Sequence, residues 1–217
     1  SSTLEWNGTL WTKVSLATSP SARSSHSTTY DSVRKRLLLF GGQSSNSIPL
    51  GDFWEYNGST WVERTPSTLP TKRYWASMAF NEFTGKAVLF GGFAATIGVN
   101  AETWEWDGTT WTKKTPAHSP PARYLAGFAY DANRKVLVLH GGNNPSSVTL
   151  SDTWEYDGTD WTDKSSGSLG TVADGFRLVY DRAAKKILRV GGNNIQADAL
   201  EVKVWDGSTW KTDTTPT

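Results

Sequence analysis

Residues 103–111 read TWEWDGTTW, so three tryptophans lie within nine positions around an Asp-Gly pair. The pattern recurs as LEWNGTLW (4–11), FWEYNGSTW (53–61), TWEYDGTDW (153–161) and VKVWDGSTW (202–210). The five copies end in Trp11, Trp61, Trp111, Trp161 and Trp210, which are 50, 50, 50 and 49 residues apart. A fixed spacing of this length is typical of a protein built from structural repeats.

Two further markers keep the same period. Glycine pairs follow apolar runs at 41–42, 91–92, 141–142 and 191–192, and Arg23, Arg73 and Arg123 lie fifty residues apart. Three markers in one register indicate a single repeated unit over the whole chain. No cysteine is present, which excludes disulfides and thiolate metal sites.

Each unit is expected to form four strands. The first is a mixed run such as LAGFAYD (125–131), and the second is a continuously apolar run such as KVLVL (135–139), typical of a strand covered on both faces. The glycine pair ends it, and about ten polar residues follow. The opening motif supplies strands three and four, because Asn-Gly or Asp-Gly between apolar residues favours a hairpin.

These features resemble kelch repeats, in particular the LFGG doublet, the aromatic residue before Asp-Gly and the tryptophan five residues after that aromatic. The resemblance implies an all-β, kelch-type β-propeller with four complete four-stranded blades plus an extra N-terminal half-blade hairpin, in one domain spanning 1–217. The half-blade is expected at 3–14, and the blades at about 21–65, 71–115, 121–165 and 171–212. The pattern is also similar to kelch arrays in large bacterial surface and secreted proteins, which favours a secreted or cell-surface bacterial location. The absence of cysteine fits exported and cytosolic proteins alike, so the compartment stays open.

The number of hairpins does not match a closed ring, because five outer hairpins accompany only four inner strand pairs. Three explanations remain open: a segment of a longer propeller, self-association through the terminal half-blades, or a displaced last hairpin. Since an unpaired sheet edge favours aggregation, we expect self-association or a missing neighbour. The near-constant period fits recent amplification of one unit and an engineered or excised array equally well.

Residues present in every copy are expected to serve the scaffold. The motif TWEWDGTTW provides a turn and ring packing that every blade needs, and Glu55, Glu105 and Glu155 recur in the same way. A binding site is instead expected at positions that differ between blades. His140 stands where two other blades have phenylalanine, which predicts a hydrogen-bonded core histidine.

The kelch resemblance implies that the loops between strands two and three, and those between blades, share one face around a central channel. The candidate ligand-binding residues there are Arg23, Arg73, Tyr74, Trp75, Arg123, Tyr124, Asn143, Asn144 and Asp174. Arginine forks bind carboxylates and aromatic faces stack on sugars, so an acidic peptide or a polyol fits. The alternative is that each arginine locks its own inter-blade turn and the asparagines form turns.

No catalytic, metal or cofactor site is expected. The three histidines fall at different positions of their units, and no phosphate-binding loop, nucleophile elbow or differently tuned pair of acids is present. A net charge of +1 gives no field that attracts nucleic acid, and no apolar run is long enough for membrane insertion.

The function expected from these observations is non-enzymatic binding of a protein or a carbohydrate through the rim loops. A structural, self-assembling propeller segment is the alternative from a different class. A kelch-type enzyme acting on sugars comes third, because it requires a convergent polar cluster that the sequence does not show.

Overall fold

The computed structural model describes residues 2–165, 175–192 and 202–213, and within them the chain is all-β with no helix. Four antiparallel sheets of four strands are named sheets 1 to 4 in chain order. Sheet 1 consists of β3 (Ser27–Asp31), β4 (Arg36–Phe40), β5 (Phe53–Tyr56) and β6 (Trp61–Arg64). Sheet 2 consists of β8 (Ser77–Asn81), β9 (Lys86–Phe90), β12 (Thr103–Trp106) and β13 (Trp111–Lys114). Sheet 3 consists of β14 (Gly127–Asp131), β15 (Val136–His140), β16 (Thr153–Tyr156) and β17 (Trp161–Asp163). Sheet 4 consists of β18 (Arg177–Asp181), β19 (Lys186–Val190), β20 (Lys203–Trp205) and β21 (Trp210–Thr212).

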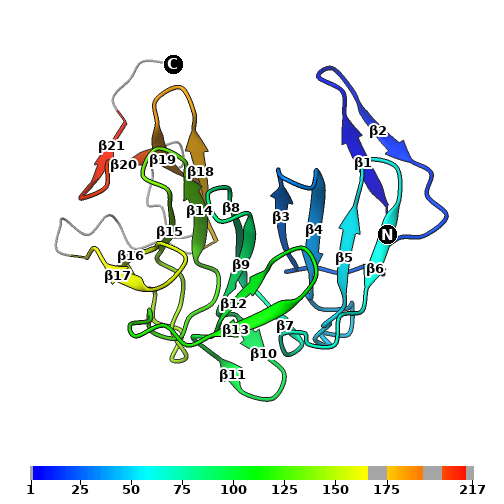
Figure 1. The fold of residues 1–217 in the computed structure, drawn as a ribbon, viewed down its shortest axis with the longest axis horizontal. Helices are drawn as coiled ribbons and strands as arrows, with labels where there is room; N and C mark the ends of the chain where they lie inside the picture. Colours follow the sequence, from blue (N-terminus) through cyan, green and yellow to red (C-terminus); the bar gives the residue numbers. More distant parts are fainter. Residues whose placement is uncertain (1, 166–174, 193–201, 214–217) are drawn as a thin grey trace.

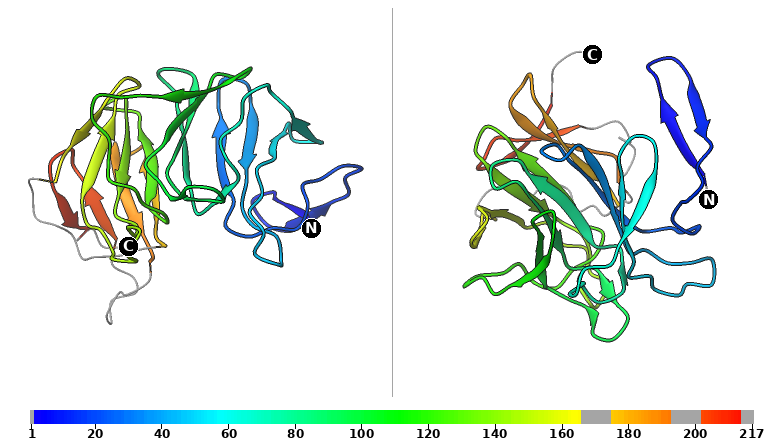
Figure 2. Two further views of the ribbon diagram at one scale, coloured as in Figure 1. Left: turned by 90° about the horizontal axis from the view of Figure 1, so that it is seen from below. Right: turned by 45° about the vertical axis from the view of Figure 1, so that its right-hand side comes forward.

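Two smaller sheets accompany these four. The N-terminal hairpin pairs β1 (Thr3–Trp6) with β2 (Trp11–Val14), and a three-stranded sheet joins β7 (Arg73–Tyr74), β10 (Phe93–Ala94) and β11 (Gly98–Val99). Figure 1 shows the sheets following one another along an open arc, with the first strands β3, β8, β14 and β18 on its inner side and the N-terminal hairpin at one end. Figure 2 shows the same order from two other directions.

The outer hairpins turn through the predicted Asn-Gly and Asp-Gly pairs. In sheet 2 the Asp107 carboxylate accepts the amides of Thr109 and Thr110, both at 2.8 Å, while Gly108 adopts a φ of 100°. Only glycine reaches this left-handed region without steric cost. The turn chemistry therefore explains why these two residue types recur in every copy.

The tryptophans that follow these turns pack between neighbouring sheets. Trp106 and Trp111 of sheet 2 lie against Phe53 of sheet 1, with ring centroids 4.8 and 5.3 Å apart and edge-on geometry. Each such indole removes about 150–250 Å² from water, or roughly 4–6 kcal/mol at 25 cal/mol per Å². The prediction that TWEWDGTTW is a packing motif is confirmed, since Trp104, Trp106 and Trp111 are all buried.

Polar contacts repeat between neighbouring sheets alongside this packing. Trp161 Nε1 donates to Thr103 Oγ1 at 3.0 Å, and the Tyr156 hydroxyl donates to Glu105 at 3.0 Å. The N-terminal hairpin binds sheet 1 through the equivalent pairs, Trp61 to Thr3 and Tyr56 to Glu5. This hairpin therefore occupies, relative to sheet 1, the place that the outer hairpin of sheet 2 occupies relative to sheet 3.

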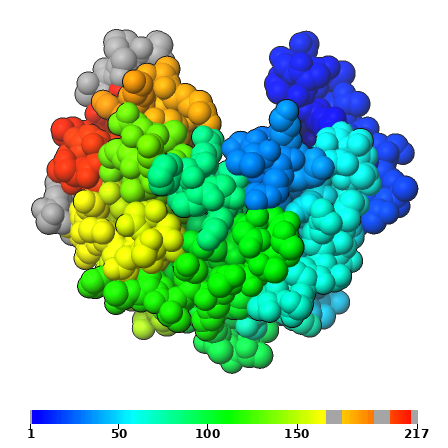
Figure 3. Space-filling model, viewed as in Figure 1, coloured from blue at the N-terminus to red at the C-terminus, as the bar shows by residue number. Residues whose placement is uncertain are grey.

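The two ends of the arc carry apolar side chains that the interior sheets bury. Trp6 and Trp11 are 51% and 61% exposed, whereas Trp106 and Trp111 at the same repeat positions are 2% exposed. At the other end, Val190 of sheet 4 is 45% exposed, at the position where Phe40 and Phe90 are buried. Figure 3 shows the surface hollowed between the N-terminal hairpin and sheet 4.

Candidate functional site

The glycine pairs that follow β4 and β9 join sheet 1 to sheet 2 and sheet 2 to sheet 3. Gly91 and Gly92 both have positive φ, and Gly92 N donates to Arg123 O at 2.9 Å. A Cβ on Gly91 would lie 2.5 Å from that same carbonyl oxygen, so no larger residue fits. Gly42 N donates to Arg73 O in the same way, so in sheets 1 and 2 the glycine pair is the backbone contact, or joint, with the segment that leads into the next sheet.

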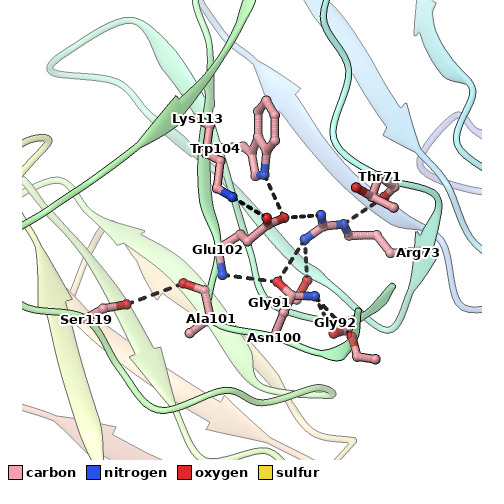
Figure 4. A network of polar contacts seen from close by, with 11 residues as sticks. Thr71, Arg73, Gly91, Gly92, Asn100, Ala101, Glu102, Trp104, Lys113 and Ser119 are labelled. Atoms are coloured by element: carbon pink, nitrogen blue, oxygen red, sulfur yellow. Dashed lines mark hydrogen bonds and ion pairs between the residues drawn. The ribbon is translucent and has the colours of Figure 1, made fainter. Parts of the chain in front are cut away.

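The arginine of each inter-sheet segment closes this joint. Arg73 is fully buried and donates to Thr71 O, Gly91 O, Asn100 Oδ1 and Glu102 (Figure 4). Burial alone would raise the pKa of Glu102, but hydrogen bonds from Lys113, Arg73 and Trp104 lower that pKa to about 2. The carboxylate therefore stays ionised and holds the guanidinium in place.

The same arrangement is present in the two neighbouring repeats. Arg123 donates to Gly141 O and to both oxygens of Asp152, and Arg23 donates to Gly41 O and to both oxygens of Asp52. The side chains of Arg23, Arg73 and Arg123 are at most 3% exposed. This geometry favours the alternative that each arginine locks its own inter-blade turn, because the guanidinium groups are buried and already donate hydrogen bonds to acceptors within the fold.

The two predicted asparagines also take part in loop structure. Asn143 is buried and exchanges backbone hydrogen bonds with Tyr124, at 3.0 and 2.8 Å. Asn144 Oδ1 accepts the amides of Ser146 and Val148, which forms an Asx turn. Asp174 lies outside the described residues.

Two backbone hydrogen bonds link three successive inter-sheet segments on the inner side of the arc. Trp75 N donates to Ser25 O and Leu125 N donates to Trp75 O, both at 3.0 Å. Ser25, Trp75 and Leu125 all have a φ of 57–58°, and Gly175 at the same repeat position has a φ of 67°. Bulky residues are rare in this left-handed region, where the strain is about 1–3 kcal/mol per residue.

Ser25, Trp75 and Leu125 line a central cavity of about 270 Å³, which extends along the first strands of sheets 1 to 4. Its other lining residues include His26, Met78, Phe128 and Arg177. The backbone is the same in each repeat, whereas the residue changes from Ser25 to Trp75 to Leu125 to Gly175. Different side chains therefore face one cavity from a repeated frame.

An aromatic row continues outward from the cavity wall, formed by Tyr124, Trp75, Tyr74 and Phe93. Trp75 stacks on Tyr124 with centroids 5.2 Å apart and planes 23° apart, and Tyr74 stacks on Phe93 at 5.2 Å and 22°. Tyr74 and Trp75 meet edge to face at 4.7 Å. Apart from partly exposed Phe93, the row is half-buried, so it forms a fixed surface.

The structure thus brings three of the predicted residues together in the aromatic row, Tyr74, Trp75 and Tyr124, and of these Trp75 lines the cavity. Sequence reasoning missed Phe93, whose place beside Tyr74 follows from the pairing of β10 with β7. It also missed Leu125 and Arg177, which line the same cavity. The signal available was the variation at positions 25, 75, 125 and 175.

His140 is buried and its Nδ1 lies 2.9 Å from Thr153 Oγ1, which confirms the prediction of a hydrogen-bonded core histidine. In the described ranges no group of three or more His, Asp or Glu side chains is placed to hold a metal ion. The same ranges contain no helix long and apolar enough to cross a membrane.

Comparison with known proteins agrees with the repeat architecture. The family model described as the KLHDC2/KLHL20/DRC7 Kelch-repeats domain matches residues 2–211. None of the curated proteins compared with the chain matches it significantly. The match covers nearly all of the chain, including all four sheets and the N-terminal hairpin.

Proposed function

We propose that this chain, which belongs to the kelch-repeat family, is a protein-binding module whose ligand contacts the aromatic row and the central cavity. Kelch-repeat domains commonly mediate protein interaction and are typically non-enzymatic. The observation that carries the proposal is the variation of side chains on a repeated backbone. Sheet 1 is preceded by Ser24 and Ser25 where sheet 2 is preceded by Tyr74 and Trp75.

The chemistry of the site suits a peptide with an apolar or aromatic side chain. Tyrosine and tryptophan are enriched at protein interfaces because they provide large contact areas and have few rotatable bonds. The cavity of about 270 Å³ is near the lower end of ligand pockets, about 300 Å³, so one large side chain or one sugar ring fits. Arg177 and His26 supply polar groups at the same cavity.

The test begins with selection of binding peptides from a displayed random library, with a panel of glycans screened in parallel. Trp75→Ser and Tyr124→Ser introduce the residue that the first repeat carries at these positions, so the fold is expected to tolerate them. We expect each to weaken binding of a selected ligand at least tenfold, since buried interface aromatics contribute about 2 kcal/mol or more.

The matched control is Phe83→Ser. Phe83 is an exposed aromatic in the turn between β8 and β9, at the opposite end of that hairpin from Trp75. Its loss is expected to leave affinity unchanged. The site would be refuted if all three variants bound the selected ligand as tightly as the native chain does. If only glycans bound at the aromatic row, the site would be assigned to carbohydrate recognition.

Self-assembly is the second candidate, and the observation that favours it is the exposure of Trp6 and Trp11 at one end of the arc. Burial of such rings against another copy would be favourable by several kcal/mol. Light scattering separates the two cases, because an unassembled chain has a mass of 23.8 kDa and an assembly a multiple of it. Trp6→Glu is expected to dissociate any such multimer, and a mass of one chain at all concentrations would refute this candidate.

A further inference from the structure

The four turns that join the first and second strands of sheets 1 to 4 meet at one end of the inner strands of the arc (Figure 1). We call them the inner turns, and they comprise residues 31–36, 81–86, 131–136 and 181–186. Arg34 donates to a backbone carbonyl of the second turn at 3.0 Å. Lys135 Nζ lies 4.8 Å from the centroid of the Phe83 ring, and Arg182 pairs with Glu82 at 2.6 Å. The turn of sheet 2 thus contacts the other three, so the inner turns form one continuous surface.

This surface is distinct from the site proposed above. The aromatic row and the cavity wall at Trp75 precede β8, whereas the turn with Phe83 follows it. The two surfaces therefore lie at opposite ends of the first strands, and a partner of one does not have to contact the other.

The inner turns carry more cations than carboxylates. The nine cationic residues are Arg34, Lys35, Arg36, Lys86, Arg134, Lys135, Arg182, Lys185 and Lys186, and the four acidic ones are Asp31, Glu82, Asp131 and Asp181. In the part of the chain that the structure describes, the exposed Lys35, Lys185 and Lys186 form no ion pair. These three ammonium groups face the solvent.

The carboxylates, in contrast, are engaged within the fold. Asp31 and Asp131 pair with the arginines three residues further on, and Asp181 accepts two backbone amides of its own turn. The neighbouring outer turns add four aspartates, which cap their own turns or bind an adjacent side chain: Asp107, Asp157, Asp160 and Asp206. The charge that this end of the molecule leaves unmatched is therefore positive.

Lysine recurs in these turns at a position that does not require it. Lys35, Lys135 and Lys185 have φ values of 57°, 60° and 55°, and Gly85 occupies the same position of sheet 2 with a φ of 68°. Glycine adopts this left-handed conformation without the steric cost that a side chain brings. The turn therefore does not explain the recurrence, and neither does a contact of Lys35 or Lys185 within the described residues. These lysines differ in this respect from the buried residues that repeat for the scaffold.

Two apolar side chains project beside these lysines. Val33 and Phe83 hold the same position of their turns and are 60% and 63% exposed. The same position carries Asn133 and Ala183 in the other two turns, so the turn itself does not need an apolar residue there. Exposed apolar tips among unpaired lysines are the combination that membrane-surface binding uses.

We propose that the inner turns bind the surface of an anionic lipid bilayer, with the lysines at the headgroups and the tips of Val33 and Phe83 in the interface. Lysine ammonium groups are point charges that suit a diffuse anionic surface, whereas a defined carboxylate favours the fork of arginine. The apolar tips need no complementary pocket in a bilayer. The small net charge of the whole chain does not oppose this contact, because charges beyond about 10 Å are screened and the local excess decides.

The probe is a set of vesicles of phosphatidylcholine, either alone or with about 30% phosphatidylserine, and the measurement is co-sedimentation of the whole chain. We expect saturable binding to the anionic vesicles alone. The binding is expected to disappear at about 0.5 M salt, where screening shortens the range of the attraction. Equal binding to both kinds of vesicle, or none to the anionic kind, overturns the proposal.

The contribution of the lysines is tested with the double variant Lys35→Gly, Lys185→Gly. It introduces the residue that sheet 2 carries at this position, so thermal unfolding is expected to be unchanged or to move to higher temperature. We expect binding to anionic vesicles to weaken at least about tenfold.

The matched control is the double variant Lys13→Gln, Lys72→Ala, which removes the same charge from exposed residues in β2 and in the segment before β7. Alanine is native at the second of these positions in two other repeats, as Ala22 and Ala122. The control is expected to weaken binding less than about threefold. Equal weakening by the two double variants would show that total charge, and not the inner turns, determines binding, and would overturn the proposal.

The apolar tip has its own test. Phe83→Asn introduces the residue of the third turn and is expected to weaken vesicle binding about tenfold. Val148→Asn removes a side chain of similar exposure, 57%, from a long loop at the other end of the strands and is expected to have no effect. Equal effects of these two substitutions would refute the orientation. Polyglutamate serves as a competing probe, and a chain that binds it but no vesicle would assign the surface to an acidic polypeptide and refute the bilayer.

Discussion

His140 makes the stability of this chain depend on pH in a way that one substitution removes. Burial, and secondarily the nearby Arg189, lowers the pKa of His140 to about 3, against about 6.5 for an unfolded histidine. Asp152 and Arg123 also lie close enough to affect it, with opposite signs. The folded chain therefore keeps this imidazole neutral over the range in which the unfolded chain protonates it.

The direction of the effect follows from proton linkage. Because the folded pKa is the lower one, the stability from His140 is complete above pH 6.5 and falls as the pH decreases toward 3. With pKa values of 6.5 and about 3, the free energy of unfolding falls by about 2 kcal/mol between pH 7 and pH 5. Most Asp and Glu side chains remain ionised over this interval, so they add little.

The substitution His140→Phe isolates this effect. Phenylalanine occupies the equivalent position in sheet 2, where Phe90 packs on Trp161 at 5.1 Å and Trp161 still donates to Thr103. In the variant, Thr153 is expected to keep the bond from Trp210 Nε1, now 2.9 Å long, while it loses that to the imidazole. The cost of the lost bond, about 1 kcal/mol, is independent of pH.

Urea unfolding of both proteins at several values between pH 7 and pH 5 measures the effect. The difference in unfolding free energy between variant and wild type is expected to shift by about 2 kcal/mol in favour of the variant as the pH falls. His26 and His118 contribute equally to both proteins and cancel. A difference that stays constant with pH would refute the assignment of His140 as a buried neutral group.

Three further sets of substitutions test the interior contacts, each by urea unfolding. Arg123→Ala leaves the partly buried Asp152 without its cation, so we expect the free energy of unfolding to fall by about 3–5 kcal/mol. The loss is expected to be smaller when Asp152→Ala is added. A loss below about 1 kcal/mol for Arg123→Ala would contradict the role of this arginine in joining the sheets. Phe53→Thr offers the buried, unpartnered Trp111 Nε1 a hydroxyl acceptor, as Thr103 does for Trp161. The loss of the phenylalanine ring costs about 3–5 kcal/mol, whereas the new hydrogen bond contributes about 1 kcal/mol, so we expect net destabilisation. An increase in stability would refute the packing argument. The double variant Asn81→Asp, Thr84→Arg reproduces the Asp131–Arg134 ion pair and removes the unpartnered amide of Asn81. We expect the free energy of unfolding to rise by about 1 kcal/mol. Asn81→Asp alone is expected to destabilise the fold, because it buries a carboxylate without a cation.

The repeat and its turns were predictable because their determinants are local. Asp107 and Gly108 set their own turn, and the spacing of Trp61, Trp111 and Trp161 reports the sheet period directly. The count of outer and inner hairpins also predicted an unmatched N-terminal hairpin, which the structure places beside sheet 1.

The site was less predictable because its geometry depends on distant residues. Arg73 donates a hydrogen bond to Glu102, which lies 29 residues further along the chain, so no local sequence pattern indicates that the two side chains are paired. The left-handed backbone at Trp75 is also hidden, since only the fourth repeat has glycine at that position, Gly175. The aromatic row forms only when β10 pairs with β7 and brings Phe93 to Tyr74.

The two backbone hydrogen bonds through Ser25, Trp75 and Leu125 form whichever side chain these positions carry. The amide and carbonyl groups link neighbouring inter-sheet segments through all three residues, whereas the stacking of Trp75 on Tyr124 is particular to one of them. Serine, tryptophan, leucine and glycine all occupy the position without a change of backbone geometry. The lining of the cavity at Ser25, Trp75 and Leu125 can therefore change one residue at a time, and with it the ligand that fits, while the backbone hydrogen bonds between the segments are retained.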